Sequence, residues 1–316
     1  MGGLNPYVFI VGCPRSGTTL LRRMVDAHRE LAITRETHWI PEIARAGVVD
    51  AGGRVGRELV LTLYAHRSFR TLKLELEEVE RCAVDGGDYA SFVSALFDLY
   101  GAHRGKRHVG DKVPGYVHEV SWLHDRWPLA RFVHLVRDGR DVTLSAVGWE
   151  RKAEYFARRF RTWGDEPLVT AALWWRWHVL AGRAQGVELP IDRYLELGYE
   201  ALVADPNDAC HRLCAFLGLE WDDRMLAFHE GRTRDEPGLS SKRAWLPPTP
   251  GLRDWRQELS ASELALVEAA IADILPAFGY EPHLDAVPEQ ARERVTAVRD
   301  RLRPDLAARA PVPEGW

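Results

Sequence analysis

The chain has 316 residues, of which 46% are hydrophobic, and its formal net charge at pH 7 is −4. A chain of this length can bury a sizeable core, and single α/β domains of this size are common. The small negative charge gives no reason to expect nucleic acid or an acidic membrane as a partner. No apolar run approaches the roughly 18 residues of a membrane span, and the N-terminus lacks a signal-peptide pattern. We therefore expect a cytoplasmic enzyme.

The first predicted strand leads into a turn that is rich in hydrogen-bond donors. Residues 7–11 are β-branched and aromatic, residues 12–17 form a glycine-containing turn, and residues 18–28 have a helical apolar pattern. A Gly-x4-Gly spacing between a buried strand and a helix is the setting of a phosphate-binding loop, because free N–H groups meet the positive end of the helix dipole there. Thr18 stands where a Walker A loop has its lysine, so we expect Arg15 to be the substitute cation.

The next segments place polar side chains at the ends of two further strands. A short strand is predicted over residues 31–34, shortly before Glu36. Residues 106–111 predict another strand, which runs into Lys112. The chain between these strands is mostly helical and carries no obvious chemistry, so we expect a helical insertion around residues 50–105.

A second candidate anion site follows the strand predicted over residues 130–136. Arg137 comes at the carboxyl end of this strand, where ligands bind in open α/β sheets. A helix is predicted from Asp138, which can cap it, to about Val147. Ser145 lies about two helical turns after Arg137, so the two side chains could jointly hold one phosphate.

The remaining elements complete an alternating pattern. Helices are predicted over residues 166–185, 208–217 and 261–278, and a strand over residues 189–195. Strands that alternate with helices favour a parallel sheet with helices on both faces, in one domain over residues 1–284. The chain then becomes rich in Arg, Glu, Ala and Pro, and we expect residues 285–316 to form a peripheral helix with a frayed end.

We interpret most of the tryptophans and cysteines that stand out in the sequence as core residues and not as catalytic or metal-binding ones. We expect core positions for Trp174, Trp175, Trp177, Cys210 and Cys214. Trp39 and Trp149 stand next to candidate site residues and could line an aromatic acceptor pocket. No Cys or His spacing is typical of a metal site, so we predict no metal cofactor.

The motifs together resemble those of one enzyme family. Residues 14–21 resemble the 5′-phosphosulfate loop of sulfotransferases that use 3′-phosphoadenosine-5′-phosphosulfate (PAPS), and the chain from there to Thr37 is similar to the tyrosylprotein sulfotransferase branch and its bacterial relatives. That branch has Glu-Glu-Thr where this chain has Arg35, Glu36 and Thr37. The resemblance implies the sulfotransferase fold, a P-loop-type parallel sheet flanked by helices on both faces.

The resemblance extends from about Tyr7 to Pro282, with a gap around residues 50–105, and implies a set of donor contacts. The implied PAPS-binding residues are Arg15, Ser16, Gly17, Thr18, Thr19, Arg137, Ser145, Tyr199, Ser241, Lys242 and Arg243. Arg137 with Ser145 resembles the family's 3′-phosphate motif, and residues 240–243 resemble a loop that closes over that phosphate.

Sulfuryl transfer is an in-line displacement, in which Arg15 and Lys112 are expected to stabilise charge on the leaving oxygen. The acceptor hydroxyl needs a general base. The resemblance implies Glu36 for that role, and His38 and His108 remain alternatives.

We expect a small-molecule alcohol, phenol or glycan as the acceptor in preference to protein tyrosine. The sequence is also compatible with a homodimer. Two other functions stay open: a nucleotide kinase with a degenerate Walker A loop, and a nucleotide-binding protein without catalysis.

Overall fold

The computed structural model describes residues 6–46, 54–230, 247–251 and 253–316. Five parallel strands of the described chain form one sheet in the order β2-β3-β1-β4-β5. They are β1 (Val8–Gly12), β2 (Leu31–Thr34), β3 (His108–Lys112), β4 (Arg131–Val136) and β5 (Tyr194–Gly198). The predicted fold class, a parallel sheet flanked by helices, is confirmed.

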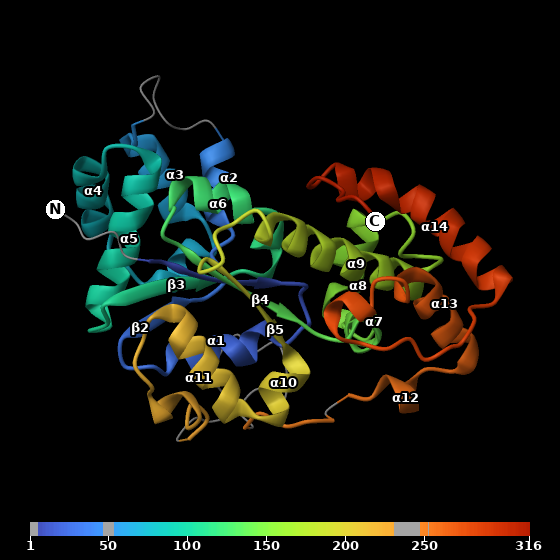
Figure 1. The fold of residues 1–316 in the computed structure, drawn as a ribbon. Helices are drawn as coiled ribbons and strands as arrows, with labels where there is room; N and C mark the ends of the chain where they lie inside the picture. Colours follow the sequence, from blue (N-terminus) through green and yellow to red (C-terminus); the bar gives the residue numbers. More distant parts are fainter. Residues whose placement is uncertain (1–5, 47–53, 231–246, 252) are drawn as a thin grey trace.

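Alternate side chains of the central strand β1 enter two different cores, as the two-residue period of a strand requires. Phe9 and Val11 belong to one core, and Val8 and Ile10 belong to the other. Figure 1 shows the sheet between two groups of helices. The first core is covered by α2 (Trp39–Arg45), α3 (Arg57–Ala65), η1 (Phe69–Leu72), α4 (Leu76–Gly86), α5 (Tyr89–His103), η2 (Pro114–His118) and α6 (Val120–Arg126). The second is covered by α1 (Thr18–Asp26), α10 (Tyr199–Ala204), α11 (Pro206–Leu217) and η3 (Asp223–Met225).

A third core is built around the long helix α9 (Pro167–Gly186), which is buried along most of its length. Around it lie α7 (Gly139–Val147), α8 (Glu150–Arg159), α13 (Ala261–Ile271) and α14 (Glu289–Ala307), with the short turns α12 (Trp255–Glu258) and η4 (Pro276–Phe278) nearby. The five predicted core side chains are all buried: Trp174, Trp175, Trp177, Cys210 and Cys214. None of the helices in the described ranges is long and apolar enough to cross a membrane.

The chain after residue 284 is packed, and the prediction of a frayed end is wrong. Val295, Leu302 and Leu306 on α14 are buried in the third core. Trp316 is only 3% exposed, and its indole N–H donates to the carbonyl of Leu173 at 3.0 Å. The apolar residues of α14 recur every three or four positions, which is the period that places them on one helix face.

Two predicted boundaries also move. The strand predicted over residues 189–195 is β5, which begins only at Tyr194. The preceding residues form a turn in which the N–H of Arg193 donates to the carbonyl of Pro190 at 2.8 Å, and a proline has no N–H for a strand ladder. The helix predicted over residues 261–278 ends at Ile271, and Pro276 starts a separate turn.

Helix α9 approaches the sheet closely at Gly182. A Cβ atom at this position would lie 2.5 Å from Cγ2 of Val117 and 2.6 Å from Cε1 of His134. His134 on β4 is fully buried, and its Nδ1 lies 2.6 Å from the hydroxyl oxygen of Tyr194. Burial lowers the pKa of His134 to about 3. The imidazole is therefore neutral and wedged between the helix and the sheet.

We expect Gly182→Ala to lower the free energy of unfolding by about 1–3 kcal/mol, because overfilling a packed core forces neighbouring atoms to shift. Urea denaturation of the purified variant would measure this change. Gly164→Ala is the matched control, since a Cβ there meets no atom within 4 Å. Equal stability of the two variants would contradict the close approach.

Candidate functional site

The loop after β1 has an unusual backbone. Gly12 has φ +148°, and a Cβ on it would lie 2.5 Å from the carbonyl oxygen of Leu135. Arg15 and Gly17 also have positive φ, 80° and 92°. Positive φ is rare for a residue with a side chain, and such strain is concentrated at functional sites. The loop ends at Thr18, the first residue of α1.

The side chain of Arg15 joins this loop to the second predicted motif. Its Nε donates to the hydroxyl of Ser145 on α7 at 3.0 Å. Its guanidinium carbon also lies 4.6 Å from the ring centroid of Trp149. Trp149, which we predicted as part of an acceptor pocket, therefore packs against the phosphate loop.

Arg137 lies directly after β4 and is buried. Its Nη2 donates to Asp141 Oδ2 at 3.2 Å, and its guanidinium carbon is 4.5 Å from the ring centroid of Tyr199. The same tyrosine ring lies against Gly17, where a Cβ would be 2.5 Å from Tyr199 Cδ2. Tyr199 therefore fills the space between the loop and Arg137.

The electrostatics of this region favour an anion. Burial lowers the pKa of Arg15, and the positive charges of Arg253 and Arg137 lower it further. Two buried hydrogen-bonding atoms, Ser16 Oγ and Arg137 Nε, have no hydrogen-bond partner among the described residues. An anionic ligand with several oxygens would offset the repulsion and satisfy both atoms.

A second charged cluster lies at the ends of β2 and β3. Lys112 is buried, and its ammonium forms an ion pair with Glu36 Oε1. The other carboxylate oxygen of Glu36 lies 3.2 Å from Nε2 of His38. Burial alone would raise the pKa of Glu36, but the hydrogen bond from His38 and the charge of Lys112 lower it to about 2. Glu36 is therefore a carboxylate at neutral pH.

Asp111 holds the turn that carries Glu36 in place. Its carboxylate is fully buried and accepts hydrogen bonds from the hydroxyls of Thr34 and Thr37, both at 2.5 Å. The two threonines flank Glu36 in the sequence, so Asp111 fixes the turn on both sides. His38, at the end of this turn, has a positive φ of 57°.

Two of the predicted residues do not lie where we expected them. His108 begins β3 and is separated from Lys112 by the length of the strand, about 13 Å at 3.3 Å per residue, so it does not lie beside Lys112 and Glu36. Trp39 is fully buried against Phe69 and does not line a pocket. The candidates Ser241, Lys242 and Arg243 lie outside the described residues.

The start of α7 is braced by a buried ion network. Asp138 caps the helix by accepting from the N–H of Arg140 at 2.9 Å, as predicted. The Arg140 guanidinium donates to Asp138 Oδ2 and to Glu268 Oε1, both at 2.8 Å. These contacts fix the turn that follows Arg137.

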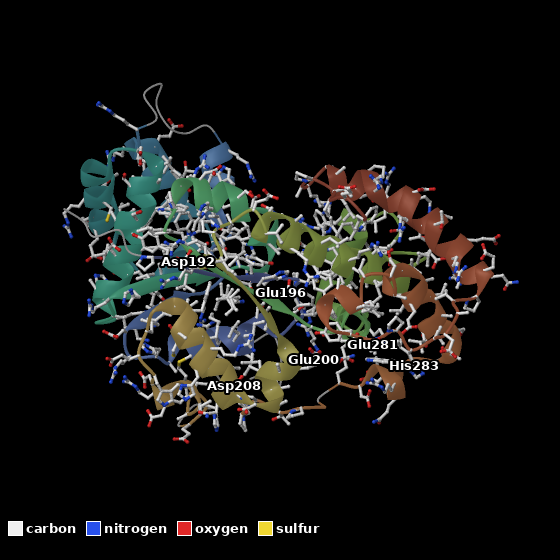
Figure 2. The ribbon with its side chains drawn as sticks, viewed as in Figure 1. Asp192, Glu196, Glu200, Asp208, Glu281 and His283 are labelled. Carbon is white, nitrogen blue, oxygen red and sulfur yellow. The ribbon has the colours of Figure 1, made fainter. Side chains whose placement is uncertain are left out.

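Glu200 braces the same turn from the other side. It accepts from the N–H of Asp138 at 3.1 Å and from the hydroxyl of Tyr280 at 2.6 Å. Figure 2 shows Glu200 at the start of α10, beside the segment that carries Glu281 and His283. Residues far apart in the sequence thus position Arg137.

The sequence profile described as the sulfotransferase family matches residues 6–223, which is more than half of the chain. The chain belongs to the sulfotransferase family. Protein-tyrosine sulfotransferase 2 of Gallus gallus is 27% identical to it over 286 residues, covering 88% of this chain and 70% of that protein. Nodulation protein NoeE of Sinorhizobium fredii is 23% identical over 330 residues, covering 93% of this chain and 71% of that protein.

Solved sulfotransferase structures share the fold. The sulfotransferase domain from the curacin biosynthetic pathway superimposes with a TM-score of 0.54 and 21% identity, covering 97% of this chain and 99% of that domain. The sulfotransferase domain of the Synechococcus PCC 7002 olefin synthase gives a TM-score of 0.52 and 22% identity, covering 93% and 94%.

Sequence reasoning missed several residues that organise the site, and Asp141 is one of them. Asp141 accepts from Arg137 through Oδ2 and from the backbone N–H of Trp255 through Oδ1, the latter at 3.0 Å. Its spacing from Arg137 was a usable signal, since residues four apart on a helix are neighbours. No local signal links Trp255 to Asp141.

We expect Asp111→Asn to flatten the pH dependence of stability in this sulfotransferase. Burial raises the pKa of Asp111 to about 6 from its ordinary value of 3.8. Between these values the folded protein holds a proton that the unfolded chain has released, so the free energy of unfolding falls as pH rises, by about 3 kcal/mol in total. Urea denaturation at several pH values between 4 and 6 would measure the difference from wild type.

The control for that comparison is Asp125→Asn, which removes an exposed carboxylate on α6. Its pH profile should run parallel to that of the wild type. A parallel profile for Asp111→Asn as well would mean that Asp111 is ionised in the folded state, against the prediction.

Proposed function

We propose that this protein transfers a sulfuryl group from PAPS to an acceptor hydroxyl. The main support is the anion site around Arg15 and Arg137, where positive charge is crowded and two buried polar atoms have no hydrogen-bond partner within the described part of the chain. PAPS carries two anionic groups on one nucleotide, a 5′-phosphosulfate and a 3′-phosphate. The Arg15–Ser145 hydrogen bond makes the two motifs adjoin, which suits such a donor. Membership of the sulfotransferase family supports the same reaction.

Each end of the donor has candidate partners. We assign the 5′-phosphosulfate to Arg15 and to the loop that leads into α1, with Ser16, Gly17, Thr18 and Thr19. The positive end of α1 favours an anion at that place. We assign the 3′-phosphate to Arg137 and Ser145, and the nucleoside between them to the ring of Tyr199, which touches both motifs.

The reaction needs one bond to form as another breaks. The acceptor oxygen bonds to sulfur, and the bond from sulfur to the bridging oxygen breaks, leaving its electron pair on the 5′-phosphate of adenosine 3′,5′-bisphosphate. Arg15 and Lys112 stabilise this negative charge. The acceptor proton passes to Glu36.

The ion pair between Lys112 and Glu36 connects these two tasks. The hydrogen bond from His38 and the charge of Lys112 together hold the pKa of Glu36 low in the free protein. A phosphosulfate competes for the same ammonium, and once Lys112 turns toward it the carboxylate becomes more basic. His38 remains hydrogen-bonded to the other carboxylate oxygen, so it can orient Glu36 while the proton is taken.

We propose that the acceptor hydroxyl belongs to a small molecule or a glycan. A phenol is the first acceptor to test. Relatives named protein-tyrosine sulfotransferases favour a tyrosyl side chain, which is also a phenol. A phenol panel and a tyrosine-containing peptide would separate these acceptors. The kinase alternative loses support because Thr18 stands in place of the Walker lysine and the family is one of sulfotransferases.

We expect the protein to bind adenosine 3′,5′-bisphosphate in the presence of EDTA, as measured by isothermal titration calorimetry. Arg137→Ala should weaken binding about 10–100-fold, because a hydrogen-bonded charge contributes about 1.5–3 kcal/mol. Arg292→Ala, on the exposed face of α14, is the control and should bind like the wild type. Binding of ATP only with Mg²⁺, and none of the bisphosphate, would instead support the kinase alternative.

We expect Glu36→Gln to lower kcat by about 10²–10⁴ while leaving affinity for adenosine 3′,5′-bisphosphate nearly unchanged, because loss of a general base affects the chemical step. The rate of sulfuryl transfer from labelled PAPS to a phenol would measure this. His38→Gln should cost less, since that residue only orients the carboxylate. A Glu36→Gln variant that turns over within a few-fold of wild type would assign the base elsewhere.

A further inference from the structure

The segment around the start of α12 is hydrogen-bonded to the start of α7. The backbone N–H of Trp255 donates to Asp141 Oδ1 at 3.0 Å, and its indole N–H donates to Asp138 Oδ2 at 3.2 Å. The other carboxylate oxygen of Asp141 accepts from Arg137. The chain just before Trp255 is therefore held beside the proposed 3′-phosphate site.

Arg253 lies in this fastened segment, two residues before Trp255. Its side chain is 31% exposed, and its Nη1 is 3.2 Å from Glu258 Oε2, which is 43% exposed. After burial, the charge of Arg253 is the largest influence that lowers the pKa of Arg15, ahead of the charge of Arg137. The guanidinium of Arg253 thus adds positive charge to the space that Arg15 and Arg137 share.

We propose that Arg253 is a third phosphate-binding cation of the donor site, acting with Arg15 and Arg137 on the anionic groups of an adenosine bisphosphate. This inference rests on the proposed function. A guanidinium can bind two phosphate oxygens at once, and the tether through Trp255 and Asp141 reduces the entropy lost when it does so.

Glu258 is the counter-ion that Arg253 uses when no donor is bound. An exposed ion pair of this kind contributes little to stability, so Arg253 can exchange it for a phosphate at small cost. Arg140 cannot do the same, because its guanidinium is already bound by Asp138 and by the buried Glu268.

Arg256 provides a matched control in the same segment. Its guanidinium lies 4.4 Å from the ring centroid of Trp255. It forms an ion pair with Asp254 at 3.9 Å, and its side chain is 64% exposed. Its charge is not among the influences on Arg15. Removing Arg256 therefore deletes the same charge without changing the proposed site.

The test is calorimetric titration of adenosine 3′,5′-bisphosphate into the full chain and its variants at low and moderate salt. We expect Arg253→Ala to weaken binding about 10-fold and to make it less sensitive to salt, because one cation no longer contributes. Arg253→Lys should keep part of the affinity, since it keeps the charge. Arg256→Ala should bind within about two-fold of wild type.

Two results would overturn the inference. In the first, wild type binds the bisphosphate and Arg253→Ala binds it equally well, which leaves the proposed function intact. In the second, Arg253→Ala, Arg253→Lys and Arg256→Ala all weaken binding alike, which assigns the effect to the fold of the segment. A wild-type protein that does not bind the bisphosphate would overturn the proposed function itself.

Discussion

Several positive charges are held away from water at the carboxyl edge of the sheet. The rest of the structure depends on how these charges are compensated. Burying a cation is expensive unless nearby groups compensate it. Lys112 has Glu36, Arg137 has Asp141 and the ring of Tyr199, and half-buried Arg15 rests on Trp149. Each compensating group comes from a different element, so the site exists only when the sheet and its helices are assembled.

Two helices of the third core, α9 and α13, help to position Arg137 at this edge of the sheet. The indole N–H of Trp175 on α9 donates to the carbonyl of Arg137 at 3.0 Å, and Glu268 on α13 binds Arg140. These contacts reach Arg137 through packed elements that contribute no proposed ligand contact themselves. Helices α9 and α13 therefore act on the site by fixing the geometry of one strand end.

Sequence patterns predicted the structural features that depend on residues close together in the chain. The strand over residues 7–11 and the glycine turn after it have local signals, and both form nearly where expected. The patterns could not predict contacts between distant segments, such as the one from Asp141 to Trp255, 114 residues apart. They also left His108 open as an alternative base, although it lies at the opposite end of β3 from Lys112, because spacing alone does not tell which end of a strand faces the site. Trp316 was missed for a similar reason, since its partner lies on α9.

The contact between Gly182 and His134 has a consequence for how this sequence can diverge. Position 182 carries no side chain, because the buried ring of His134 lies within 3 Å of the place where a Cβ would be. The two positions share a single volume, so neither can grow while the other stays as it is. Divergence here must proceed by exchange, with a larger residue on the helix accompanied by a smaller one on the strand. Covariation of these two positions among related sequences is the trace that such a shared volume leaves.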